Sequence, residues 1–143
     1  MKLLHTRIRV GDLERSLSFY CDRLGFRIAT RSDRSPSGNR IVLLTLPGNA
    51  HQLELCWSAD YPLKVPEDLM HLALGVPDLI ACCARLEAAG IVIWPEGWRT
   101  KLIQGAKMAF IDDPDGYEIE LLEREPEAFL KGDSGSSELP IES

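Results

Sequence analysis

Residues 4–13 read Leu-His-Thr-Arg-Ile-Arg-Val-Gly-Asp-Leu, and residues 70–79 read Met-His-Leu-Ala-Leu-Gly-Val-Pro-Asp-Leu. The two stretches are 66 positions apart. They share a histidine in second place, an aspartate in ninth place, and apolar residues in first, fifth, seventh and tenth place. Because polar and apolar positions repeat together, the sequence predicts an internal duplication.

The duplication also repeats a pair of side chains that can bind metal. His5 precedes Glu54 by 49 positions, and His71 precedes Glu120 by the same 49. Two imidazoles and two carboxylates brought together would bind a divalent metal. The alternative is that the histidines are hydrogen-bonded within a sheet and the glutamates are solvated at strand edges. Both glutamates lie within apolar strands, where an unpartnered carboxylate is costly, and this favours the metal site. The third histidine, His51, is predicted to lie on the surface.

Hydrophobic periodicity predicts the same order of elements in each half. Apolar residues alternate in the first segment of each half, and a helix-spaced segment follows that begins after an aspartate and ends at a glycine. The expected strands are 3–10, 26–30, 41–46 and 52–57 in the first half and 70–76, 91–94, 107–112 and 117–123 in the second, with helices at 13–24 and 79–89 and a loop through residue 105. The prediction is an α+β fold made of two tandem βαβββ modules, about residues 1–60 and 69–123 of one domain spanning 1–123. Residues 124–143 are expected to form a partly disordered tail.

Composition excludes several classes of function. The net charge of −6 and the pI near 5.1 disfavour nucleic-acid binding. The sequence contains neither an N-terminal secretion signal nor a segment of the roughly 20 apolar residues that cross a membrane. The four cysteines, Cys21, Cys56, Cys82 and Cys83, lack disulfide or metal spacing and predict reduced thiols. We therefore expect a cytoplasmic protein that binds neither nucleic acid nor membrane.

Two longer motifs carry a resemblance to a known family. Residues 3–20 with the following Leu-Gly-Phe at 24–26, and residues 109–123, which contain Asp-Asp-Pro-Asp-Gly-Tyr-Glu-Ile-Glu, resemble the two signatures of glyoxalase I (lactoylglutathione lyase) in the vicinal oxygen chelate superfamily. The resemblance covers residues 1 to about 123. It implies a curled mixed sheet that forms the metal cleft, and its four metal ligands fall on His5, Glu54, His71 and Glu120. It also implies a homodimer in which the first pair of one chain meets the second pair of the other.

The activity implied by the resemblance is isomerisation of the hemithioacetal of methylglyoxal and glutathione to S-lactoylglutathione, through an enediolate. Glu120 is the expected base at the metal, and Glu54 holds the opposite side as the alternative base. The chain's length resembles the nickel- or cobalt-preferring forms, and zinc is also compatible with the ligands. Glutathione is the expected co-substrate.

Several residues are candidates for substrate binding. Arg9 matches a family contact to the glutathione carboxylates. Ser58 stands where many members carry an asparagine that holds the thiol cofactor, which leaves the thiol open. Arg99, Lys101 and Lys107 supply positive charge in the second-half loop. Two other functions stay open: a different enzyme on this scaffold, a dioxygenase or an epimerase, and a non-catalytic ligand-binding protein.

Overall fold

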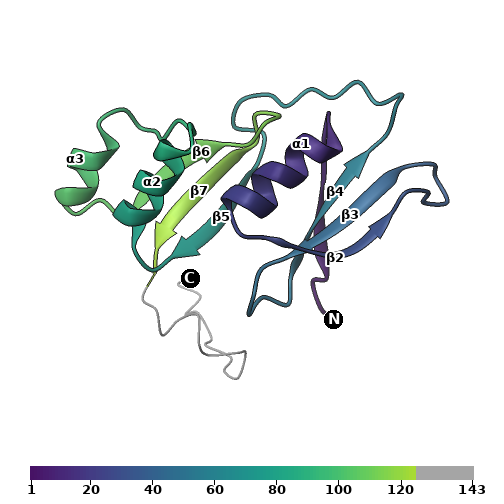
Figure 1. Ribbon diagram of the computed structural model, residues 1–143, viewed down its shortest axis with the longest axis horizontal. Helices are drawn as coiled ribbons and strands as arrows, with labels where there is room; N and C mark the ends of the chain where they lie inside the picture. Colours follow the sequence, from purple (N-terminus) through teal and green to yellow (C-terminus); the bar gives the residue numbers. More distant parts are fainter. Residues whose placement is uncertain (125–143) are drawn as a thin grey trace, which may run out of the picture.

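A computed structural model describes residues 1–124 of the chain. The elements in order are β1 (His5–Arg9), α1 (Leu13–Leu17), η1 (Ser18–Arg23), β2 (Arg27–Ser32), β3 (Arg40–Thr45), β4 (Gln52–Trp57), β5 (His71–Val76), α2 (Leu79–Ala88), α3 (Trp98–Ile103), β6 (Met108–Asp112) and β7 (Glu118–Glu123). The predicted α+β class is confirmed, with helices and two mixed sheets (Figure 1). The prediction of a partly disordered tail concerns residues 124–143, which lie outside the described residues except for residue 124.

The first half forms a four-stranded sheet in the order β1-β4-β3-β2. β1 runs parallel to β4, and the other neighbours are antiparallel. The alternation predicted for the first strand is present, because Ile8 and Val10 are buried whereas His5 on the opposite face is exposed. This alternation directs the histidine away from the apolar core.

The second half forms a separate three-stranded sheet in the order β5-β7-β6. β5 is parallel to β7 as β1 is to β4, so first and last strands are neighbours in both halves. Leu72, Leu74 and Val76 of β5 are half-buried, whereas His71 and Ala73 are exposed. The two sheets do not join into one, and each presents its histidine on the face opposite the core.

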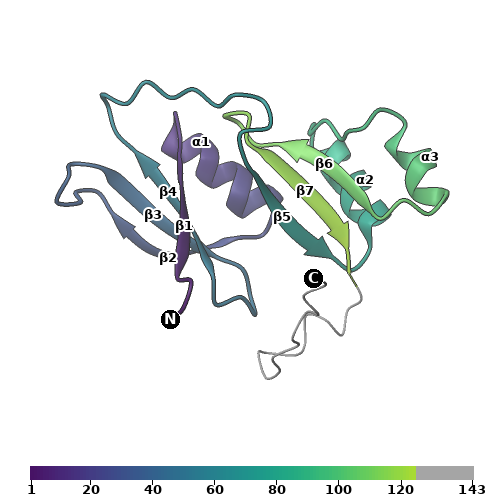
Figure 2. The same cartoon turned by 180° about the vertical axis from the view of Figure 1, so that it is seen from behind.

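The two predicted helices begin where the sequence predicts. The Asp12 carboxylate accepts a hydrogen bond from the Arg15 amide at the start of α1, and Asp78 accepts one from Ala81 at the start of α2. The predicted helix 13–24 is present as α1 followed by the π-helical turns of η1. Figures 1 and 2 show α1 and α2 on one side of the sheets, with α1 near the middle of the molecule.

The prediction for residues 91–105 is wrong in two respects. Residues 91–94 form no regular strand; only Trp94 pairs with Phe110, through backbone hydrogen bonds of 2.8 and 2.9 Å. Ile93 is buried and Val92 is exposed, as in a strand, but no neighbouring strand of the described chain pairs with residues 91–93. The expected loop through residue 105 contains the short helix α3, which buries Trp98 and Leu102 one turn apart.

The turn before β7 joins the two halves. Asp115 accepts hydrogen bonds from the Gly11 amide at 3.2 Å and from the Arg15 guanidinium at 2.9 Å. The buried Tyr20 donates its hydroxyl to Asp113 at 2.8 Å. Buried apolar residues of both halves form one core cluster around these contacts. Among the helices within residues 1–124, none combines the length and apolar character that a membrane crossing requires.

Candidate metal centre

The first His–Glu pair lies on neighbouring parallel strands. His5 is on β1 and Glu54 on β4, and their Nε2 and Oε2 atoms are 3.5 Å apart. Glu54 is only 5% exposed, and its neighbours Leu53 and Leu55 are buried. The imidazole is more open, so the pair consists of a buried carboxylate beneath an accessible ring.

The second pair repeats this geometry. Nε2 of His71 on β5 lies 3.5 Å from Oε2 of Glu120 on β7. The Glu120 side chain is 17% exposed, against 7% for Glu54. The spacing of the sequence repeat is therefore reproduced as a repeat of side-chain geometry, with the second carboxylate more accessible than the first.

The 3.5 Å separation fits two ligands of one metal ion. It exceeds the usual range for a direct nitrogen–oxygen hydrogen bond, about 2.7–3.2 Å. A nitrogen and an oxygen that each lie about 2.1 Å from a tetrahedral metal are separated by roughly 3.4 Å. Imidazole nitrogen and carboxylate oxygen are also donors that zinc, nickel and cobalt accept. Each pair therefore has the chemistry and spacing of half a metal site.

One chain does not bring the two pairs together. Within residues 1–124, no group of three or more His, Cys, Asp or Glu side chains is close enough to hold a metal. The pairs belong to different sheets, which lie side by side in Figure 2. Within the described part of the chain, His5, Glu54, His71 and Glu120 therefore do not form a single four-ligand site.

Arg7 is a neighbour of the first pair whose role the sequence analysis did not identify. It lies opposite Glu54 in the register of β1 and β4, and its Nε donates to Oε1 of that carboxylate. The two Glu54 oxygens are thus divided, one toward Arg7 and the other toward His5. The hydrogen bond to Glu54 raises the pKa of Arg7. The alternation of β1 places Arg7 on the same face as His5, but only the structure shows its partner.

Arg9 and Ser58 are brought together beside the first pair. Nη1 of Arg9 donates to the Ser58 hydroxyl at 2.8 Å and to Oδ1 of Asn39 at 3.4 Å. The guanidinium also lies 4.4 Å from the ring centroid of Tyr61. Asn39 was not identified from the sequence, because it lies in a segment without periodicity, and Tyr61 was expected only as a residue that lines an apolar pocket or fills the core and its rim. Together these residues form a polar group, centred on a cation, on the face that carries His5.

The candidates from the second-half loop lie elsewhere. Arg99 is on α3, where it forms an ion pair of 2.9 Å with Glu87 of α2 and stacks over the Trp98 ring. Lys101 is exposed on the same helix, and Lys107 donates to Glu123. Figure 1 shows α3 at the outer end of the second half. Within one chain, these cations do not join the group around Arg9, so their role in substrate binding stays a prediction.

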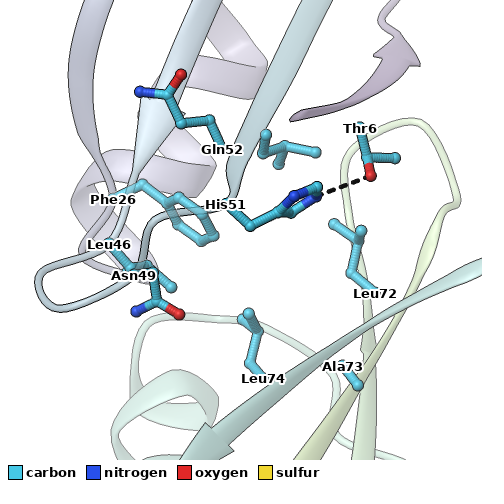
Figure 3. Close-up of a pocket in the computed structure, with 10 residues that line it drawn as sticks. Thr6, Phe26, Leu46, Asn49, His51, Gln52, Leu72, Ala73 and Leu74 are labelled. Atoms are coloured by element: carbon cyan, nitrogen blue, oxygen red, sulfur yellow. Dashed lines mark hydrogen bonds between the residues drawn. The ribbon is translucent and has the colours of Figure 1, made fainter. Parts of the chain in front are cut away.

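A small cavity of about 150 Å³ lies between the two halves (Figure 3). It is lined by Thr6, Phe26, Leu46, Asn49, His51, Gln52, Leu53, Leu72, Ala73 and Leu74. His51 is exposed, as expected for a surface residue, and its Nε2 lies 2.9 Å from the Thr6 hydroxyl. The lining is mostly apolar and contains neither His–Glu pair, so this cavity is separate from the candidate metal centre.

The sequence matches a known protein family and its members along most of the chain. The family model described as "Glyoxalase/Bleomycin resistance protein/Dioxygenase superfamily" matches residues 2–121. The chain is 38% identical over 129 residues to a probable lactoylglutathione lyase of Synechocystis, covering 86% of this chain and 95% of that protein. It is 35% identical over 127 residues to the lactoylglutathione lyase of Haemophilus influenzae, with coverage of 86% and 93%.

Solved structures with this fold include an enzyme and a binding protein. The trypanothione-dependent glyoxalase I of Leishmania major matches with a TM-score of 0.71 and 36% identity, covering 86% of each chain. TnmS3, an antibiotic-binding protein of Streptomyces sp. CB03234, matches with a TM-score of 0.66 and 26% identity, covering 86% of this chain and 95% of that one. The architecture therefore supports both catalysis and ligand binding, and the site residues must distinguish them.

Proposed function

Because the chain belongs to the glyoxalase/bleomycin resistance protein/dioxygenase superfamily, we propose that it is a glyoxalase I. It would isomerise the hemithioacetal of methylglyoxal and glutathione to S-lactoylglutathione. Relatives named lactoylglutathione lyase that align with most of the chain support this assignment. The structural observation that carries it is the repeated His–Glu pair, with the same 3.5 Å separation on two sheets.

The proposed metal centre belongs to a homodimer. His5 and Glu54 of one chain would meet His71 and Glu120 of a second copy, which completes two sites per dimer. This arrangement is supported by the separation of the pairs within residues 1–124 and by the exposed faces on which both histidines lie. When bound, the divalent metal supplies Lewis acidity to two neighbouring substrate oxygens. Nickel or cobalt is favoured, and zinc is compatible with the same donors.

Glu120 is the proposed base. It takes the proton from the hemithioacetal carbon and returns it to the adjacent carbon, so the substrate is isomerised without net loss of a proton. Its accessibility supports this role, because a base must reach the substrate carbon. Glu54 is more buried and already interacts with both Arg7 and His5. It is therefore better suited to remain a metal ligand, with the role of base as its alternative.

Arg9 and Ser58 are the proposed contacts for the thiol cofactor. A guanidinium recognises the carboxylates of glutathione through charge-assisted hydrogen bonds. The Ser58 hydroxyl, 2.8 Å from Nη1 of Arg9, orients this cation toward the face of His5. Arg99 and Lys101 remain further candidates for the glutathione carboxylates. A serine in place of the asparagine common in the family makes the choice of thiol the property most worth measuring.

Replacing Arg9 by Gln is expected to raise KM for the hemithioacetal by about 10- to 150-fold, since a hydrogen bond to a charged group contributes about 1.5–3 kcal/mol. The change in kcat should be small, because Arg9 binds the thiol portion and not the reacting carbons. Steady-state kinetics measures both constants. Arg27→Gln, an exposed arginine of β2, is the matched control. A fall in kcat at unchanged KM would contradict this role.

The cysteines are consistent with a reducing compartment. All four are free thiols in the structure. Burial raises the pKa of Cys21, Cys82 and Cys83, the last to about 11, so these thiols stay protonated at neutral pH. We propose the cytoplasm as the location, where thiols of this kind persist.

Metal reconstitution tests the proposed function. Metal-free protein is reloaded with nickel, cobalt, zinc or manganese, and thioester formation from methylglyoxal and glutathione is followed by absorbance, with trypanothione as a second thiol. We expect thioester formation with at least one metal, and no oxygen uptake when catechols are supplied. Oxygen uptake would instead indicate a dioxygenase. Absence of thioester formation with every metal and both thiols would refute the proposal that the protein is a glyoxalase I.

A further inference from the structure

The two half-sites differ by one cation. Arg7 lies opposite Glu54 in the parallel register of β1 and β4, and its Nε donates to Oε1 of that carboxylate. Ala73 lies opposite Glu120 in the equivalent register of β5 and β7. The same 66-residue shift that superposes the histidines superposes Arg7 on Ala73. The first carboxylate therefore has a resident counter-ion on the facing strand, and the second does not.

We propose that Arg7 is the counter-cation of Glu54 in the metal-free chain and that it lowers the affinity of the site for metal. The inference rests on the proposed function in one respect, namely that Glu54 is a metal ligand. Glu54 is 5% exposed and lies between two buried leucines, so its charge needs a partner when no metal is bound. Arg7 supplies that partner, and a metal therefore gains less on binding than it would from an uncompensated carboxylate.

Electrostatic repulsion between the Arg7 guanidinium and a bound metal also lowers the affinity for metal. The guanidinium remains on the carboxylate that the metal also binds, and a divalent ion repels it twice as strongly as a single charge would at the same distance. Arg7 is partly exposed, which weakens this repulsion without removing it. Arg7, which is not itself a metal ligand, thus raises the free-energy cost of placing a metal beside Glu54.

One effect opposes the proposal. A hydrogen bond to a metal-binding carboxylate orients it, and loss of such a bond commonly weakens metal affinity. At Glu54, however, orientation has another source, because its strand lies between β1 and β3 and its side chain is buried. The contribution of Arg7 to orientation is therefore small, and its positive charge has the larger effect on metal affinity.

The test compares metal affinity in wild-type protein with that in Arg7→Met and Arg7→Lys. Metal-free proteins are titrated with nickel and with zinc by calorimetry or chelator competition, with no substrate present. Arg7→Met, which removes the charge but keeps an unbranched side chain, is expected to bind metal at least about tenfold more tightly. Arg7→Lys, which keeps the charge, should stay near wild type. Arg27→Met, on β2, is the control for removing an arginine from the same sheet.

Thermal unfolding supplies a second measurement on the same proteins. Arg7→Met should lower the Tm of the metal-free protein, because Glu54 loses its partner, and should enlarge the rise in Tm on adding metal. Equal or weaker metal binding by Arg7→Met, beside a wild-type chain that binds metal, would overturn this inference alone. Failure of both proteins to bind metal would overturn the proposed metal centre, and this inference with it.

Discussion

Glu120→Gln is expected to lower kcat by about 10²–10⁴-fold, the range associated with loss of a positioned general acid–base group. Glutamine has nearly the shape of glutamate and keeps an oxygen that can face the metal, but its amide does not accept a proton at neutral pH. The substrate proton then has no acceptor on the side of His71. Metal content should fall far less than activity.

The measurement is kcat together with metal bound per chain, determined on the same preparation. Glu118→Gln is the matched control, because Glu118 lies two residues earlier on the same face of β7. It differs from Glu120 in that the 3.5 Å contact with Nε2 of His71 is made by Glu120. The control should keep most of its activity. Near wild-type kcat in Glu120→Gln would refute Glu120 as the base, and Glu54→Gln would then be expected to show the loss.

The first half could be predicted closely because its signals are long and mutually consistent. The predicted strand 52–57 matches β4 in full, and the predicted helix 13–24 overlaps α1 and η1 throughout. Alternation fixed the face on which His5 lies, and an N-terminal aspartate fixed the start of the helix. The periodicity did not reveal the π-helical geometry of η1, because the apolar residues that predict an α-helix, Leu13, Leu17 and Tyr20, are buried in the observed structure as well.

The second half shows where such signals mislead. The residues Ile-Val-Ile-Trp at 91–94 have strong strand propensity, yet strand formation needs a partner and a buried face. Only Trp94 finds a partner, in Phe110, and Pro95 then removes the next backbone donor. Helix α3 is only six residues long, shorter than the windows in which helical periodicity becomes visible.

The sequence predicted the two His–Glu pairs of the candidate site, but it did not predict the contacts of the residues around them. The repeat at 66 residues selects all four His and Glu side chains, and strand alternation indicates the face they share. Arg7 was visible on that face, but its contact with Glu54 depends on the parallel register of β1 and β4. The hydrophobic pattern distinguishes the two faces of a strand, but a shift by two residues keeps every side chain on its face, so the pattern does not identify Glu54 as the residue opposite Arg7.

A pair of half-site variants is expected to restore activity when combined in one dimer. One chain carries His5→Ala and Glu54→Ala, and the other carries His71→Ala and Glu120→Ala. Each homodimer lacks half of every metal site and should be inactive. In the heterodimer, all four substitutions fall in one site and the other is intact, so we expect about half of the wild-type activity per dimer. Co-expression with two affinity tags isolates the heterodimer, and thioester formation measures its activity.

A second heterodimer carries the same four substitutions in one chain, and it is expected to be inactive. When one chain carries all four alanines and its partner is wild type, each shared site loses one half, and the dimer should be inactive. If every chain instead held its own complete site, this second heterodimer would keep about half of the activity and the first would keep none. The outcome therefore distinguishes sites shared between chains from sites within a chain, independently of which metal is bound and of which thiol is used.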